Sequence, residues 1–80
     1  MFDDTTKQHA YNEQTEKALQ NKTSNCPDCA LSNKEAENTK IYDIKQMEAD
    51  HVTPWSKGGA TTIDNCTMLC TRHNRAKGNR

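Results

Sequence analysis

Hydrophobic positions are sparse along the chain, and their spacing predicts an α+β domain that opens with a helix. Residues 3–23 are typical of a helix, but its few apolar positions indicate weak packing on the remainder. Partial alternation in "KIYDIKQMEADHV" predicts one or two short strands. Residues 53–65 are typical of a loop with a Gly-Gly turn, and the segment from Cys66 predicts a short strand or turn entering a helix. The predicted order is helix, Cys-x-x-Cys turn, strand, loop, strand, helix.

Composition adds that the core is small and needs further support. Only 31% of the 80 residues are hydrophobic and 28% are charged, and chains this short often depend on disulfides or a metal. Four cysteines and three histidines offer either solution. No signal peptide or apolar span is visible, so we expect a cytoplasmic protein without membrane contact. A reducing compartment favours zinc over the alternative, a disulfide-stapled secreted domain.

The cysteine spacing predicts which side chains would bind zinc. Cys26 and Cys29 form a knuckle in which two thiolates from one turn reach one ion. Cys66, Cys70 and His73 compete for the second half of the site. We favour Cys70 with His73, whose gap repeats that of the knuckle, and Cys66 is then a buried small hydrophobe. Four protein ligands leave no open position, so this zinc would be structural.

Charge is divided unevenly although the total is zero. Residues 1–50 carry six Lys and ten acidic residues (−4), whereas residues 51–80 carry five Lys or Arg and one Asp (+4). A basic C-terminal segment suits a nucleic-acid backbone, and a solvated helical face is the alternative. The candidate phosphate-binding residues are Lys57, Arg72, Arg75 and Lys77.

Three stretches, "ADHVTPWSKGG", "DN" and "LCTRHNRAKG", together resemble the HNH endonucleases over residues 26–80. The resemblance implies a small ββα-metal, treble-clef-like domain stapled by zinc, with residues 1–25 as a helix packed on it. The family's first His falls on His51, its central Asn on Asn65, and its third position on Asn74, where His is usual. The chain is therefore similar to the HNN variant. If Cys66 completed the zinc site, His73 could take the third role, but the spacing favours Asn74.

This resemblance implies hydrolysis of DNA phosphodiester bonds with Mg²⁺ or Mn²⁺. His51 would be the general base, because imidazole titrates near neutral pH. Asp50 and Asn74 supply the hard oxygen ligands that these cations prefer. Asp50 and His51, as neighbours on a strand, should point to opposite sides. Asn65 would tie the loop so that His51 keeps its orientation, and Trp55 is expected to pack over this loop, with base stacking as the alternative.

The sequence leaves two hypotheses for the function open. One is the endonuclease described above, and the other is a zinc-finger-like module that binds nucleic acid or protein without catalysis. The Asn at the third position favours the second hypothesis. In either case the basic helix is the only visible recognition element. We therefore expect other domains of a longer bacterial or phage protein to supply targeting.

Overall fold

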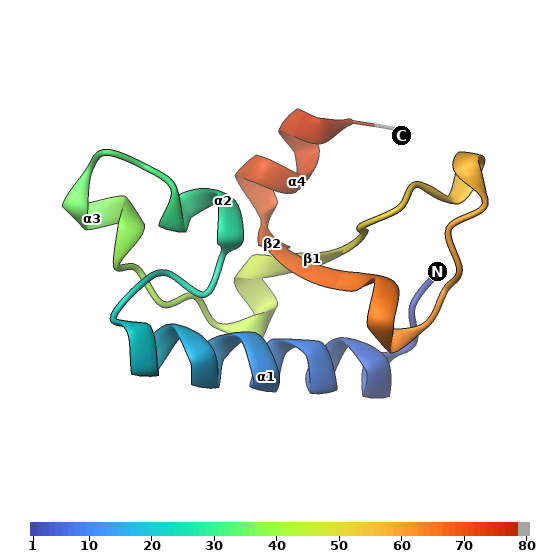
Figure 1. Ribbon diagram of the computed structural model, residues 1–80, viewed down its shortest axis with the longest axis horizontal. Coiled ribbons are helices and arrows are strands. Elements are labelled where there is room, and N and C mark those ends of the chain that lie inside the picture. The colour runs from blue at the N-terminus through green and yellow to red at the C-terminus, as the bar shows by residue number, and fades with distance from the viewer. Residues whose placement is uncertain (79–80) are drawn as a thin grey trace.

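A computed structural model describes residues 1–78, and residues 79–80, the end of the predicted 26–80 domain and of its basic segment, lie outside the described residues. The architecture is α+β, with two antiparallel strands and helices, as predicted (Figure 1). The elements are α1 (Asp4–Asn21), α2 (Pro27–Ala30), α3 (Glu35–Asn38), β1 (Met47–His51), β2 (Cys66–Cys70) and α4 (Thr71–Lys77). Their order confirms the predicted sequence of elements. No helix within residues 1–78 is both long and apolar enough to cross a membrane.

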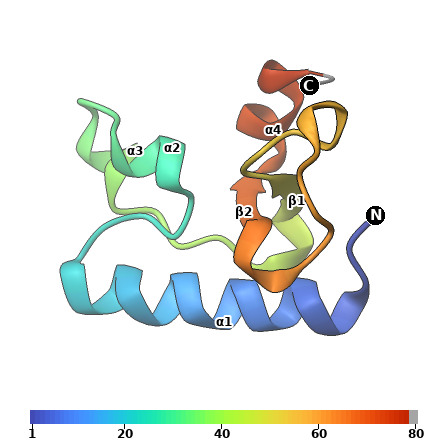
Figure 2. The same cartoon turned by 45° about the vertical axis from the view of Figure 1, so that its right-hand side comes forward.

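The two strands form a hairpin that lies between α1 and α4 (Figures 1 and 2). They pair antiparallel, with Met47 opposite Cys70 and His51 opposite Cys66. Because side chains alternate along a strand, Met47 turns into the core, whereas Glu48 and Asp50 reach side chains of α4. The hairpin therefore presents different chemistry to its two covering helices.

Helix α1 is held more firmly than its sparse apolar positions predict. The Asp3 side chain caps it by accepting from the Thr6 amide at 2.7 Å. Of its residues, Ala10 and Ala18 are buried. The Gln14 side chain forms the two hydrogen bonds with the backbone of β2 that a neighbouring strand would form. Its Oε1 accepts from the Met68 amide at 2.7 Å, and its Nε2 donates to the Met68 carbonyl at 2.9 Å. Polar bonds to the edge of β2 thus supplement the sparse hydrophobic packing of α1.

Asn25 is a second polar anchor, almost completely buried just before the zinc knuckle. Its Nδ2 donates to the hydroxyl of Thr15 and to the carbonyl of Tyr42, and its Oδ1 accepts from the Tyr42 amide. The Tyr11 hydroxyl donates to the same Tyr42 carbonyl at 2.7 Å. This network joins α1 to the segment that leads into β1. Burial of the Asn25 amide is tolerated because its donors and its acceptor are all paired.

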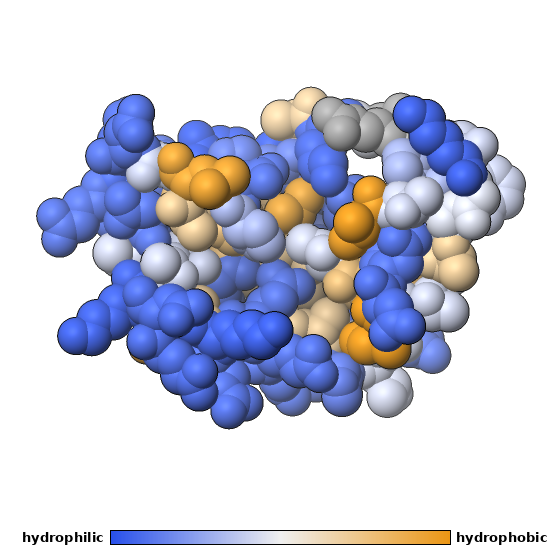
Figure 3. Space-filling view, in the orientation of Figure 1, coloured by the Kyte–Doolittle hydropathy of each residue, from blue (hydrophilic) through white to orange (hydrophobic). Residues whose placement is uncertain are grey.

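The core is small, and the face of the molecule seen in Figure 3 is mostly hydrophilic. Its buried members come from the N-terminus, α1, the knuckle and both strands: Phe2, Ala10, Cys26, Cys29, Met47, Cys66, Met68, Leu69 and Cys70. Trp55 is not among them. Its side chain is 74% exposed, so the prediction that it packs over the loop as core is wrong. It sits in a 3₁₀ turn, Trp55–Lys57, in the loop between the two strands.

Candidate active site and zinc centre

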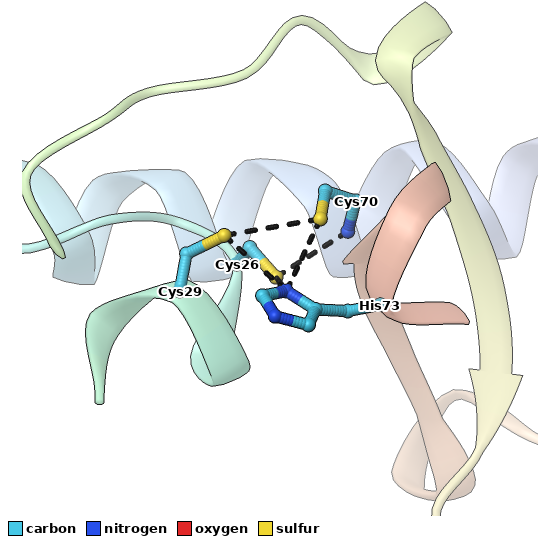
Figure 4. Close-up of side chains that lie close together, drawn as sticks. All are labelled: Cys26, Cys29, Cys70 and His73. Carbon is cyan, nitrogen blue, oxygen red and sulfur yellow. Dashed lines mark hydrogen bonds between the residues drawn. The ribbon is translucent and has the colours of Figure 1, made fainter. Parts of the chain in front are cut away.

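Four side chains from distant parts of the chain converge on one point (Figure 4). Cys26, Cys29, Cys70 and His73 place one ligand atom each within 4.8 Å of all the others. The Sγ atoms of Cys29 and Cys70 are 3.8 Å apart, and Nδ1 of His73 lies 3.4 and 3.2 Å from them. A tetrahedron with zinc–ligand bonds of about 2.0–2.3 Å has edges of about 3.3–3.8 Å. The cluster therefore has both the donor set and the dimensions for zinc.

Local structure explains how these ligands are brought together. Cys26 precedes α2, where Pro27 starts the helix without needing a backbone donor, and one turn carries the chain to Cys29. Cys70 ends β2, and His73 lies in the first turn of α4. The Cys70 amide also donates to Sγ of Cys26 at 3.3 Å, so the two halves of the site already share a hydrogen bond.

Burial raises the pKa of one thiol in this cluster. Desolvation raises the pKa of the Cys26 thiol to about 11, because a thiolate loses its hydration there. Zinc binding must therefore displace a proton from this thiol. The Tyr42 hydroxyl lies 3.3 Å from Sγ of Cys29, and this hydrogen bond, together with burial, raises the pKa of Tyr42. Tyr42 thus stays protonated and able to donate to a thiolate ligand.

The remaining cysteine takes no part in the cluster. Cys66 is 8% exposed at the opposite end of β2 from Cys70, and it packs in the hydrophobic core as predicted. His73 lies in the Cys3His cluster and Cys66 does not, so the geometry favours Cys70 and His73 over the alternative in which Cys66 binds zinc and His73 serves the nuclease site. All four thiols are free, so the structure does not contain the disulfides of the secreted-domain alternative.

His51 ends β1, where two contacts hold its ring. Its Nε2 lies 3.1 Å from the Thr61 hydroxyl, and its ring centroid is 4.3 Å from that of Phe2, with the planes tilted by 31°. Phe2 is 4% exposed, so it gives the imidazole a fixed apolar support. Asp50 instead turns to α4, which confirms that the two neighbours face opposite sides of the strand. Neither Phe2 nor Thr61 stood out in the sequence.

Asn65 braces the loop that joins the two strands. Its Oδ1 accepts from the Thr53 amide at 2.7 Å, and its Nδ2 donates to the carbonyls of Thr53 at 3.0 Å and Ala60 at 2.8 Å. Its own carbonyl accepts from the Val52 amide. Ala60 directly precedes Thr61, the partner of His51. Asn65 is therefore placed to hold His51 indirectly, through the shape of the loop.

The hydrogen bonds of Asn65 across the loop require a glycine at position 59, and replacement of Gly59 by alanine should disrupt them. A Cβ at Gly59 would overlap the carbonyl oxygen of Thr53 and come within 2.9 Å of Nδ2 of Asn65. Backbone atoms cannot swing aside, so we expect Gly59→Ala to lower the free energy of unfolding by about 1–3 kcal/mol, measured by urea titration.

The neighbouring glycine provides the control for this prediction. Gly58 has a positive φ of 83° but open space around its Cα, and Asn tolerates the left-handed region. Gly58→Asn should therefore be nearly as stable as the wild type. Equal losses in both variants would contradict the role given to the close approach at Gly59.

The predicted ligands of a catalytic cation lie on facing elements, each with another partner. Asp50 Oδ2 accepts from Nζ of Lys77 at 2.6 Å, and Asn74 Nδ2 donates to Oε1 of Glu48 at 2.9 Å. Because the nitrogen of Asn74 is committed to Glu48, its oxygen is the atom left for a cation. Glu48, which the sequence did not indicate, adds a second carboxylate on the same face of β1.

The predicted phosphate-binding residues do not share one environment. Arg72 lies 3.5 Å from Glu37 and Arg75 lies 3.7 Å from Glu48, with the guanidinium groups exposed and the glutamates half-buried. Exposed ion pairs contribute little and exchange readily for other anions, so both guanidinium groups remain suited to phosphate. Lys57 is exposed in the loop. Lys77 differs, because its ammonium group is part of a half-buried pair with Asp50.

Fold and site together define a zinc-stapled ββα domain with an Asp-His pair at the end of its first strand. A sequence model of the HNH endonuclease family matches residues 26–80, which is more than half of the chain. The chain therefore belongs to the HNH endonuclease family. Comparisons with curated proteins and with solved structures gave no match.

Proposed function

We propose that this chain is a metal-dependent endonuclease that hydrolyses DNA phosphodiester bonds. The observation that carries the proposal is the division at the end of β1: Asp50 turns to α4 and His51 turns to the loop. A carboxylate that could bind a cation and an imidazole that could deprotonate a water thus lie on opposite sides of the strand at adjacent residues. Family membership supports a nucleic-acid substrate.

The oxygen atoms of Asp50 and Asn74 fit Mg²⁺ or Mn²⁺, which take few protein ligands and fill the remaining positions with water and substrate phosphate. Such a cation, when bound, supplies charge stabilisation to the scissile phosphate and the leaving 3′ oxygen. Glu48 orients the Asn74 amide through its hydrogen bond. Asn74, rather than His73, fits the third family position because His73 belongs to the zinc cluster.

His51 is the general base in this proposal. If the Thr61 hydroxyl accepts a hydrogen bond from Nε2, the proton is fixed there and Nδ1 keeps the lone pair that takes a proton from water. Phe2 limits rotation of the ring from its apolar side. Asn65 keeps Thr61 in place by holding the carbonyl of Ala60. None of these groups needs to move for the water to be deprotonated.

Exposed Lys57, Arg72 and Arg75 would bind the phosphate backbone without reading its sequence. We further propose that other domains of a longer bacterial or phage protein select the target, and that the free thiols and zinc site suit the cytoplasm. The rival proposal, a binding module without catalysis, draws on the Lys77–Asp50 ion pair, which engages the carboxylate that a cation needs.

Plasmid nicking tests the proposal. The zinc-loaded chain should nick supercoiled DNA with Mg²⁺ or Mn²⁺ and not without them; omitting the cation is preferable to a chelator, which would also remove zinc. Asn74→Ala should lose the activity, because it removes an oxygen ligand. Asn74→His, which introduces the residue usual in the family, should retain it. A folded wild type that cleaves with neither cation would favour the binding module instead.

A further inference from the structure

Trp55 is the single tryptophan of a chain with few hydrophobic residues, yet 74% of it is exposed. A folding domain short of core gains stability by burying such a side chain. Leaving it in solvent therefore indicates a use outside the fold. The loop between β1 and β2, which carries it, lies at the right of Figure 1, on the far side of the molecule from α3.

The turn that carries Trp55 is well ordered by hydrogen bonds. The Pro54 carbonyl accepts from the amides of Lys57 at 2.9 Å and Gly59 at 3.0 Å, and the Trp55 carbonyl accepts from the Gly58 amide at 3.0 Å. The Asn65 brace holds the loop on both sides of this turn, at Thr53 and Ala60. The indole is thus presented on a preformed backbone, so binding through it costs little ordering of the chain.

The surroundings of Trp55 suit a nucleobase better than a protein surface. Its loop begins directly after His51 and ends at Asn65, so the indole belongs to the same segment as the proposed general base. Its neighbours in the turn are Ser56 and the exposed Lys57. Protein interfaces need a broad, partly apolar patch. An exposed indole with an exposed lysine two residues away in the same turn matches the way proteins hold single strands, by stacking on bases and pairing with phosphates.

We propose that Trp55 stacks on an unpaired base of the nucleic acid near the scissile phosphate, with Lys57 on the adjoining backbone. This inference rests on the proposed nuclease function of the same site. In an intact duplex the faces of the bases are covered by their neighbours, and exposing one costs unstacking energy. The substrate class is therefore single-stranded or locally unpaired nucleic acid, such as a gap or a flap.

Intrinsic fluorescence gives a direct test, because Trp55 is the only tryptophan. The zinc-loaded chain, without Mg²⁺ or Mn²⁺, would be titrated with a single strand of about 12 nucleotides, within the footprint of single-strand binding proteins. A blunt-ended duplex, formed by annealing the same strand to its complement, is the matched control. We expect quenching with the single strand and little with the duplex. No quenching, or equal quenching by both, would overturn the proposal.

Substitutions then separate stacking from simple apolar contact. Trp55→Leu should weaken single-strand binding roughly tenfold, the scale of one base–aromatic stack, and should raise KM for cleavage more than it lowers kcat. Trp55→Phe, which keeps an aromatic ring, should lose less. Binding of labelled single strand is followed by anisotropy, and zinc content and circular dichroism verify the fold. A Trp55→Leu chain that fails to fold would assign the indole to packing and refute the proposal.

The readouts distinguish this inference from the proposed function. Quenching by single strand without cleavage under any cation would support the stacking surface and remove the nuclease. Cleavage that Trp55→Leu leaves unchanged would keep the nuclease and overturn the stacking.

Discussion

Replacement of Cys29 by serine should remove zinc and, with it, the fold. Cys29 is fully buried and its Sγ lies within 3.8 Å of two other ligand atoms, so no other side chain can take its place. Structural zinc contributes about 10–16 kcal/mol in zinc-finger peptides, whereas whole domains are stable by only about 5–15 kcal/mol. We expect the variant to bind less than one zinc per chain and to lack a cooperative unfolding transition.

Cys66→Ser is the matched control, because it makes the same chemical change at another buried cysteine outside the cluster. It should keep one zinc per chain and lose only the stability expected for a polar atom in the core, about 1–3 kcal/mol. Zinc would be measured by elemental analysis and unfolding by circular dichroism. A Cys29→Ser chain that keeps its zinc and unfolds like Cys66→Ser would contradict the assignment.

The zinc ligands and the division of Asp50 from His51 were predictable because both depend on local spacing. A Cys-x-x-Cys turn brings two thiols together whatever the rest of the chain does, and Cys70 with His73 repeats that gap at a strand–helix junction. Strand alternation alone separates neighbours such as Asp50 and His51. Cys66 was assigned to the core by elimination, and its burial confirms it.

The supports of the site were not predictable, because they join residues far apart through polar or isolated groups. Gln14 bonds to the backbone of Met68, and nothing near Gln14 marks it as a strand partner. Phe2 is a lone aromatic residue at the N-terminus that reaches His51 across the fold. Hydrophobic periodicity detects faces that many residues share, so single long-range contacts leave no pattern in it.

Trp55 is a hydrophobic residue whose position was also not predictable from the sequence. Its hydrophobicity predicted burial, but the loop that carries it is ordered by its own hydrogen bonds and by Asn65. The turn needs no hydrophobic anchor, so the backbone decides where the indole goes. The exposure of Trp55 depends on how the loop folds back on itself, and the hydrophobic pattern of the sequence does not predict this.

Replacement of His51 by alanine should lower the rate of cleavage by about 10²–10⁴-fold, the usual contribution of a general base, while zinc and fold are retained. The imidazole lies at the open end of β1, away from the zinc ligands at the other end of the hairpin. Single-turnover cleavage, with the enzyme in saturating excess over the substrate, would isolate the chemical step. His51→Gln keeps bulk against Phe2 but provides no base, so it should lose as much as His51→Ala.

Thr61 supplies the comparison that makes this test specific to the orientation of the ring. Thr61→Val keeps the shape of the side chain but removes the oxygen 3.1 Å from Nε2, which is the acceptor that the proposed mechanism gives to the Nε2 proton of His51. We expect a loss on the order of tenfold, as for residues that orient functional groups. Thr61→Ser keeps the hydroxyl and should stay near the wild-type rate. Nitrogen NMR of the imidazole should show the Nε2–H tautomer in wild type and Thr61→Ser, and a mixture in Thr61→Val. Full activity of His51→Ala would instead move the general base to another residue, and Thr61 would then hold only the loop.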